Sequence, residues 1–180
     1  GRHTVLLLEA GGTHRRFMVD MPAGWGALTY HPTYSWMHQT EPEAYAGGRR
    51  LMMPRGKVVG GSSSINGMIY IRGHRHDLPA VHPVTRAMIA AAQQAGLEAV
   101  DDFNDGQARG VGVYQVNMVN GRRSSIAHRA IAPALGRTNL KLVTGAFVQR
   151  IVFDGRTGTG VEWHTQDGAT HRAQARAEVL

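Results

Sequence analysis

The sequence predicts a mixed α/β fold whose first part contains a buried parallel strand and whose last part is mainly antiparallel β-structure. Two patterns carry this prediction: the continuous apolar run HTVLLL at residues 3–8, and the succession of strand-like segments between residues 140 and 180. With 180 residues, of which 42% are hydrophobic and 18% charged, the chain is long enough for a domain with its own core.

The N-terminal part is predicted to hold little regular structure besides the first strand. That strand ends at Glu9, and residues 13–50 show one short strand-like stretch, at 35–40. A stretch this long with so little periodicity is uncommon unless it is functional or wraps a ligand. A helix is expected to open within residues 62–69, with a serine as its N-cap.

The clearest helix of the sequence is PVTRAMIAAAQQA, at residues 83–95. Pro83 suits the first helical position and Gly96 suits the C-terminal cap. The apolar residues of one face are Val84, Met88, Ala91, Ala92 and Ala95.

The C-terminal part is predicted to consist of strands and one short helix. Residues 112–119 alternate like a strand, and Asn120-Gly121 is a turn pattern. Residues 124–135 are expected to form a short helix that begins with cap-type serines and is interrupted by Pro133. Further strands are expected at 140–144, at 146–153, and within GTGVEWHT and THRAQARAEVL.

The composition excludes several classes of site and partner. The absence of cysteine excludes disulfides, thiolate metal sites and a cysteine nucleophile. The net charge is +7, but the arginines occur in scattered pairs and form no basic helix face, so we expect no nucleic-acid partner. The sequence shows neither an apolar run of membrane-spanning length nor a signal peptide, and we expect a cytoplasmic protein.

Glu9 stands at the end of the first predicted strand. In a dinucleotide-binding βαβ unit, the second strand ends in an acid that binds a ribose hydroxyl, and a glycine fingerprint lies about 20 residues upstream. Counting back from Glu9 passes the first residue, so the fingerprint is expected to be missing. A strand-end glutamate that faces solvent is the simpler alternative.

A second pattern is the glycine- and serine-rich stretch within PRGKVVGGSSSINGMIYIRGHRHD, at residues 54–77. Gly60 and Gly61 let backbone N–H groups approach a phosphate closely, and Ser62 and Ser63 add hydroxyl donors. A helix behind them would turn its positive end toward the anion. The stretch therefore predicts an anion cradle, with a simple glycine-serine turn that caps a helix as the alternative.

The longer segment EPE…GGRRLMMPRGKVVGGSSSINGMIYIRGHRHD resembles the N-terminal signature of the glucose-methanol-choline (GMC) family of flavoprotein oxidoreductases, most closely its choline dehydrogenase-like branch. The resemblance continues through EAGG, residues 101–155 and GVEW, so it covers nearly the whole chain. It implies a partial FAD-binding, Rossmann-like domain of GMC type with an attached antiparallel β region.

The resemblance also implies where FAD binds. Glu9 would meet the adenosine ribose, residues 59–63 would line the flavin and pyrophosphate side, and Val148 would contact the adenine. Asn66, Gly67 and Met68 would lie near the isoalloxazine ring. The implied cofactor-binding residues are Glu9, Ala10, Gly11, Arg55, Val59, Gly60, Gly61, Ser62, Ser63, Asn66, Gly67, Met68 and Val148. Because Ile65 occupies the position where some relatives attach the flavin through a histidine, we expect non-covalent FAD.

The chain also departs from the family pattern. Asp77 passes directly to LPAVHPVTRAM, where the family carries a tryptophan-bearing segment, and the C-terminal half with the family's catalytic histidine is not present. We therefore expect a chain truncated at both ends and internally shortened. Its expected parts are a partial FAD-binding domain at 1–77, a shortened substrate-cap or linker region at 78–135, and a β-rich return to the FAD-binding domain at 136–180.

The histidines and serines suggest no further site. His74 and His76 stand beside Asp77, but a zinc site needs a fuller ligand set, so we interpret this pair as surface or flavin-adjacent histidines. His128 and His164 are interpreted as ordinary polar positions. Ser124-Ser125 lacks the G-x-S-x-G elbow of a nucleophile and is interpreted as a helix cap. We assign no catalytic residue and no metal ligand.

The resemblance implies an FAD-dependent oxidoreductase acting on the CH–OH group of a small alcohol such as choline, with hydride transfer to flavin N5. The aromatic residues available to bind a quaternary ammonium group are Trp25, Tyr30, Tyr34 and Trp36. The alternative is a non-catalytic remnant that binds FAD weakly or not at all. In that case, the exposed apolar edge of the first strand favours self-association or pairing with a complementing chain.

Overall fold

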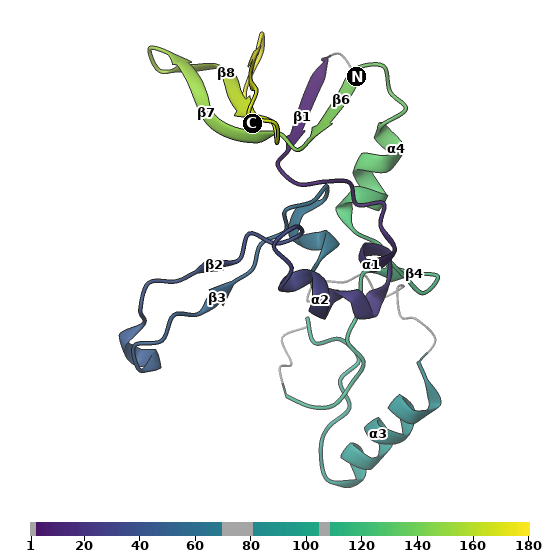
Figure 1. The fold of residues 1–180 in the computed structure, drawn as a ribbon. Helices are drawn as coiled ribbons and strands as arrows, with labels where there is room; N and C mark the ends of the chain where they lie inside the picture. Colours follow the sequence, from purple (N-terminus) through teal and green to yellow (C-terminus); the bar gives the residue numbers. More distant parts are fainter. Residues whose placement is uncertain (1–2, 70–80, 105–108) are drawn as a thin grey trace.

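In the computed structural model, which describes residues 3–69, 81–104 and 109–180, the chain forms a mixed α/β fold with four small sheets (Figure 1). The strands are β1 (Val5–Glu9), β2 (His38–Gln39), β3 (Met52–Met53), β4 (Met118–Val119), β5 (Arg122–Arg123), β6 (Leu140–Thr144), β7 (Phe147–Asp154), β8 (Thr157–His164) and β9 (Thr170–Gln174). The helices are α1 (Phe17–Asp20), η1 (Pro22–Gly24), α2 (Trp25–Thr29), η2 (Ala44–Ala46), η3 (Gly61–Ser64), α3 (Pro83–Gln94), η4 (Ala127–Ile131) and α4 (Ala132–Ala134).

The parallel pair β1–β6 confirms the first predicted strand and the strand at 140–144. Its register runs from Val5 opposite Leu140 to Glu9 opposite Thr144. Because the two strands are parallel, their carboxyl ends meet at the same edge. Glu9 therefore lies beside the turn that connects β6 to β7.

The C-terminal strands form an antiparallel sheet in the order β7-β8-β9, as the sequence predicts. Phe147 pairs with His164, and the register shifts between Val148 and Arg150. The last strand ends at Gln174, which is earlier than the predicted segment THRAQARAEVL. The sheet follows β6 directly, so its first residues lie close to the end of β1 (Figure 1).

The region of low periodicity contains a long hairpin arm built on β2 and β3, with η2 at its tip (Figure 1). The strand predicted at 35–40 is shortened to His38–Gln39. Met37 has a φ of 52°, in the left-handed region, and this conformation interrupts the extended backbone between Trp36 and β2.

The prediction of a helix that opens within residues 62–69 is wrong beyond the first turn. Only the short 3-10 helix η3 forms, and Ile65 leaves it with a φ of −129°. Asn66 then accepts a hydrogen bond from the Met68 N–H at 3.1 Å, and Met68 has a φ of 63°. This local side-chain bond offers the backbone an alternative to a helix.

Two other predictions need correction. The strand predicted at 112–119 is reduced to β4, which pairs with β5 across the Asn120-Gly121 turn. The predicted helix at 124–135 is present as η4 and α4, and Pro133 does not interrupt it. The turn before this proline is a π-helix, in which the Ala132 N–H donates to the Ala127 carbonyl. Pro133 lies in the first turn of α4, where the missing N–H of a proline is tolerated.

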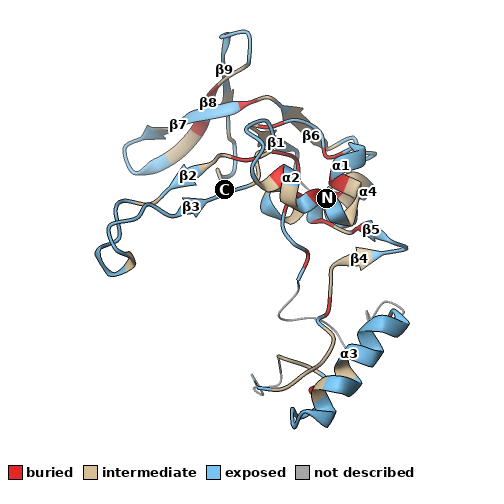
Figure 2. Ribbon diagram, turned by 60° about the horizontal axis from the view of Figure 1, so that its bottom comes forward, coloured by how far each residue is buried: buried red, intermediate tan, exposed pale blue. Residues whose placement is uncertain are grey.

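Helix α3 confirms the prediction at 83–95, with Pro83 at its start and a φ of 93° at Gly96 after its end. Its apolar face is not part of a core within the described residues: Val84 is 59% exposed and Met88 is 68% exposed. Figure 2 shows the same contrast, because α3 is mostly pale blue and the buried residues gather elsewhere. None of the helices in the described part of the chain is long and apolar enough to cross a membrane.

The main core cluster lies where α1 and α2 meet the glycine-serine loop, which comprises residues 59–64 (Figure 2). Val19 and Leu28 come from the two helices, and Val58 and Ile65 come from either side of the loop. Tyr34 packs against this cluster. The loop is therefore anchored at both of its ends by buried apolar side chains.

The chain crosses this loop closely just after β1. The Val59 N–H donates to the Gly12 carbonyl at 3.0 Å, and Gly12 forms a parallel bridge with Val58. Gly11 is buried, and a Cβ placed on it would overlap the carbonyl of Lys57. Nothing lies within 4 Å of a Cβ placed on Gly12.

These neighbouring glycines give a first prediction. Gly11→Ala is expected to lower the free energy of unfolding by about 1–3 kcal/mol, because the added methyl group forces the two backbones apart. Gly12→Ala is the matched control and is expected to change it by less than about 1 kcal/mol. Urea unfolding followed by circular dichroism measures both. Equal unfolding midpoints for the two variants would show that the close approach at Gly11 does not matter.

Candidate functional site

Glu9 lies half-buried at the end of β1, and its carboxylate turns back toward its own backbone. The Gly11 N–H donates to Glu9 Oε1 at 2.7 Å. The next turn is fixed to the same place, since the Ala146 N–H donates to the Glu9 carbonyl and the Gly145 N–H to the Gly11 carbonyl, both at 2.9 Å. Glu9 is therefore half-buried at the end of β1, with one carboxylate oxygen bound to the local backbone.

The glycine-serine loop is held in shape by its own polar groups. The Ser62 hydroxyl accepts from the Gly56 N–H at 3.0 Å. The Ser63 hydroxyl donates to the Gly60 carbonyl at 2.7 Å, and the Gly61 N–H donates to the Val58 carbonyl at 2.7 Å. The Ser63 proton and the Gly61 N–H are thus engaged within the loop, whereas the Ser62 hydroxyl retains its proton as a donor.

Gly60 is required by the loop for two reasons. Its φ of 92° lies in the left-handed region that favours glycine. A Cβ at Gly60 would also lie 2.6 Å from the Ser64 hydroxyl oxygen and 2.9 Å from the Ala127 Cβ. The loop therefore packs directly against the helical segment that begins near Ala127, more than 60 residues away in sequence.

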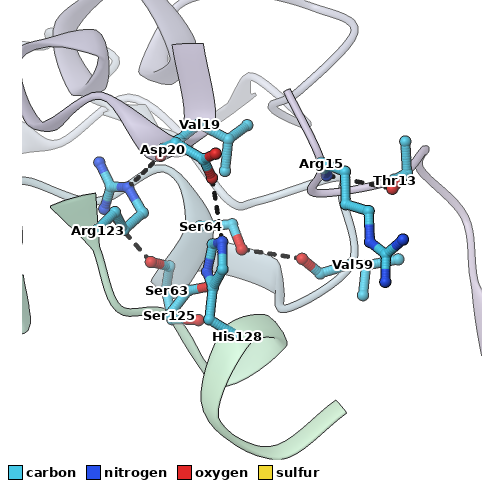
Figure 3. Close-up of polar contacts among 10 residues, drawn as sticks. All are labelled: Thr13, Arg15, Val19, Asp20, Val59, Ser63, Ser64, Arg123, Ser125 and His128. Carbon is cyan, nitrogen blue, oxygen red and sulfur yellow. Dashed lines mark hydrogen bonds and ion pairs between the residues drawn. The ribbon is translucent and has the colours of Figure 1, made fainter. Parts of the chain in front are cut away.

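The stretch from Arg123 on β5 to the start of η4 packs against the loop (Figure 3). The Ile126 N–H donates to the Ser63 hydroxyl oxygen at 3.1 Å. Arg123 is only 2% exposed, and its guanidinium binds the carbonyls of Ser63, Asn66 and Val19. The sequence analysis missed Arg123, because Arg122-Arg123 is one of the scattered arginine pairs and no neighbouring residue sets it apart.

Asp20, His128 and Ser125 are joined in a chain of hydrogen bonds next to this stretch (Figure 3). His128 Nε2 lies 3.0 Å from Asp20 Oδ1, and His128 Nδ1 lies 2.9 Å from the Ser125 hydroxyl. The same residue types form hydrolytic triads, but Ser125 is 0% exposed and no substrate reaches it. The arrangement is a packed polar network that joins α1 to η4.

The serines before η4 do not cap it, contrary to the sequence prediction. The Ser125 hydroxyl binds the His128 ring, and the Ser124 hydroxyl accepts from Arg129 Nε at 2.6 Å. The helix start has no side-chain cap bond. These hydroxyls instead bind side chains three and five residues further along the chain.

His14 packs against this network and is 3% exposed. Its ring meets the His128 ring edge-on, with the centroids 4.9 Å apart. Burial lowers the pKa of His14 below its ordinary value, His128 and Arg15 lower it further, and Asp20 acts in the opposite direction. His14 Nδ1 is buried and has no hydrogen-bond partner among the described residues.

The remaining residues expected to bind the cofactor are Gly67, Val148 and Arg55. Gly67 is exposed, and a Cβ placed on it would lie 4.0 Å from Trp25 Cδ2. Val148 is 39% exposed on β7, and Arg55 is an exposed residue whose guanidinium donates to the Pro54 carbonyl at 2.8 Å. Backbone hydrogen bonds join residues 9–11 to the turn before Val148, and the adjoining Gly12 joins the same segment to Val59 in the loop.

The four aromatic residues considered for a quaternary ammonium do not gather. Trp36 already has the Lys57 ammonium 4.7 Å from its ring centre and contacts Phe147. Tyr34 faces His31. Within the described ranges, no ring contact joins any two of these four residues.

Metal binding finds no support in the part of the chain that the structure describes. It contains no group of three or more histidine, cysteine, aspartate or glutamate residues that could hold a metal ion. The expected histidine pair His74 and His76, together with Asp77, lies outside the described residues.

Comparison with known sequences assigns the chain to a family. A family model for GMC oxidoreductase matches residues 6–80 and 78–180. The oxygen-dependent choline dehydrogenase of Brucella ovis is 35% identical over 226 aligned positions, which include all of this chain and 41% of the relative. The enzyme of the same name from Vibrio vulnificus is 33% identical over 227 positions, again with all of this chain and 40% of the relative.

Two consequences follow from these alignments. The chain spans about two fifths of the length of the curated relatives that it matches. An alignment of 226 positions for 180 residues also means that the relatives carry internal residues that this chain lacks. This agrees with the internal shortening predicted after Asp77, where the two matched stretches of the family model meet.

Solved structures give the same picture of the fold. Pyridoxine 4-oxidase from "Mesorbium loti" superposes with a TM-score of 0.80 and 28% identity, over 96% of this chain and 43% of that protein. Formate oxidase from Aspergillus oryzae also has a TM-score of 0.80, at 19% identity, over 98% of this chain and 40% of that protein. The second likeness supports the fold alone.

The buried His14 predicts a pH dependence of stability. Below a pH of about 6.5, the unfolded chain takes up a proton at this histidine that the folded chain does not, so the free energy of unfolding falls as the medium becomes more acidic. His14→Phe removes this group and is expected to flatten the decline. His3→Phe, at an exposed histidine, is the control. Urea unfolding between roughly pH 8 and pH 5.5 measures the slopes, and equal slopes for both variants and wild type would contradict the prediction.

Proposed function

The chain belongs to the GMC oxidoreductase family, and we propose that it binds FAD non-covalently as part of an FAD-dependent oxidoreductase acting on the CH–OH group of a small alcohol. The observation that carries the proposal is the backbone-linked meeting of three segments: residues 9–11 with the adjoining Gly12, the loop at 59–63, and the turn before Val148. These are the segments expected to receive the adenosine, pyrophosphate and flavin parts of the cofactor.

The residues present fit such a ligand. Glu9 Oε1 is held by the Gly11 N–H, which leaves Oε2 without a hydrogen bond among the described residues and available to a ribose hydroxyl. A Cβ built on Gly61 meets nothing within 4 Å, so the outer side of the loop is open at this point. The Ser62 hydroxyl, which accepts from Gly56, still has a proton to donate outward.

Non-covalent binding is supported by Ile65. The side chain is 3% exposed and belongs to the core cluster with Val58. An aliphatic side chain has no nucleophile with which to form a bond to the flavin. We keep Arg55, Gly67 and Val148 as proposed cofactor contacts on the strength of the family resemblance.

The proposed activity divides the work between cofactor and protein. FAD, when bound, supplies the hydride-accepting chemistry. The described residues bind and orient it, and we assign no catalytic base among them. Choline is the proposed substrate class because the curated relatives are named oxygen-dependent choline dehydrogenase. A cytoplasmic location remains a prediction.

A non-catalytic chain that associates with itself or with a complementing chain is the second candidate. The observation that favours it is β1, where Val5 is 46% and Leu6 is 38% exposed. Their side chains point to opposite faces, and β1 pairs with β6 alone among the described strands. An apolar strand with one unpaired edge is a site for pairing with another chain.

The FAD proposal is tested by titrating the 180-residue chain with FAD and following flavin fluorescence. Wild-type chain is expected to retain a visible flavin band after desalting. Glu9→Gln is expected to raise the Kd by about tenfold or more, because a hydrogen bond to a charged acceptor becomes a weaker, neutral one. Glu178→Gln, at an exposed residue far along the chain, is the control. A colourless wild-type chain would reject FAD binding and favour the second candidate.

The self-association proposal is tested by analytical ultracentrifugation over a concentration series. Wild-type chain is expected to associate as concentration rises. Leu6→Lys is expected to reduce this association, because a charge on an exposed strand opposes pairing. Met88→Lys, on the exposed face of α3, adds the same charge elsewhere and is expected to leave association unchanged. A wild-type chain that stays monomeric throughout, or equal effects of both variants, would refute a role for β1.

A further inference from the structure

Arg123 is the most completely buried large side chain of the described chain that carries a charge. Arg123 lies on β5, and its guanidinium binds residues that are far away in sequence. The loop residues Asn66 and Ser63 precede it by 57 and 60 positions, and Val19 in α1 precedes it by 104. Nε donates to the Val19 carbonyl at 3.0 Å. Nη1 lies 2.7 Å from the Asn66 carbonyl, 2.8 Å from Asn66 Oδ1 and 3.3 Å from the Ser63 carbonyl.

The charge of Arg123 is not neutralised by any ion pair in the described ranges. Burial lowers its pKa, yet a guanidinium remains protonated in proteins. Its Nη2 is also buried and has no hydrogen-bond partner among the described residues. Burying a cation without a counter-ion is costly, and an apolar side chain of similar volume would avoid this cost.

What Arg123 holds explains why the charge is tolerated. Asn66 Oδ1 accepts from Arg123 and from the Met68 N–H, so the asparagine side chain links the guanidinium to the left-handed turn at Met68. Ser63, whose carbonyl is the third acceptor in the loop, donates to the Gly60 carbonyl. One side chain thus binds residues 63 and 66 directly, and these two residues link it to Gly60 and Met68 through their own hydrogen bonds.

We propose that Arg123 is a positioning residue for the cofactor loop at 60–68: it fixes the loop from behind in its binding shape and places an uncompensated positive charge beside it. This inference rests on the proposed FAD binding, since residues 66–68 are those expected near the isoalloxazine ring. A fixed positive charge near a flavin favours the more negatively charged reduced form. Arg123 is therefore expected to influence both the affinity for FAD and the flavin midpoint potential.

The experiment compares Arg123→Met, Arg123→Lys and Arg122→Met. The neighbouring Arg122 lies on the same strand but is exposed, so it controls for the loss of a positive charge from β5. Two properties are measured on the FAD-loaded chain: the Kd for FAD and the flavin midpoint potential. A third, amide hydrogen exchange of residues 60–68, is measured on the chain without FAD.

Arg123→Met is expected to raise the Kd for FAD by about tenfold or more and to lower the midpoint potential, while Arg122→Met changes neither. Arg123→Lys keeps the charge but loses the planar guanidinium that binds several carbonyls at once. It is therefore expected to weaken FAD binding and to retain the midpoint potential. Faster exchange confined to residues 60–68, with β7 and β8 still protected, shows that the loop loosens while the fold persists.

Two results would overturn the inference, and a third would overturn the proposed function instead. An Arg123→Met chain that binds FAD within about twofold of wild type at an unchanged potential removes any role in the cofactor site. Unchanged exchange at 60–68 removes the positioning role even when no flavin is present. If wild-type chain itself retains no FAD, the proposed function fails, and the exchange measurement alone then decides whether Arg123 orders the loop.

Discussion

The close approach between Gly11 and the Lys57 carbonyl is the constraint on which the rest of the site depends. It brings the end of β1 against the start of the glycine-serine loop, where no Cβ fits. The parallel pairing of β1 with β6 brings the turn at Gly145 to the Gly11 carbonyl from the other direction. Three segments that are far apart in sequence therefore meet around Gly11, and the contact with the loop requires that this position carry no side chain.

Local patterns predicted the regular elements well. The apolar run at 3–8, the capped helix at 83–95 and the C-terminal strands all carry their information within ten or fifteen residues, and the structure confirms them. The helix expected after Gly61 failed because Asn66 binds the Met68 N–H and turns the backbone away. The exposed face of α3 shows a second limit: periodicity predicts an apolar face, but not what covers it.

The candidate site divides in the same way. Glu9 and the glycine-serine loop were recognisable because a strand-end acid and paired glycines have a physical meaning in a short window. Arg123 was not recognisable, because nothing within a few residues distinguishes it from the exposed Arg122 beside it. Only the return of the chain through β5 makes one arginine a surface residue and the other the partner of the Ser63 and Asn66 carbonyls.

The glycine and serine content of the loop is explained first by the loop's own shape. The hydroxyls of Ser63 and Ser64 donate to the carbonyls of Gly60 and Val59. The guanidinium of Arg123 donates to carbonyls that these hydroxyls do not reach. Replacing Arg123 with an apolar residue would avoid a buried charge but would leave these carbonyls without donors, at about 1–3 kcal/mol for each. A buried cation is thus the group that satisfies several converging carbonyls at once, and the loop presents an ordered outer side because its inner side is bound in this way.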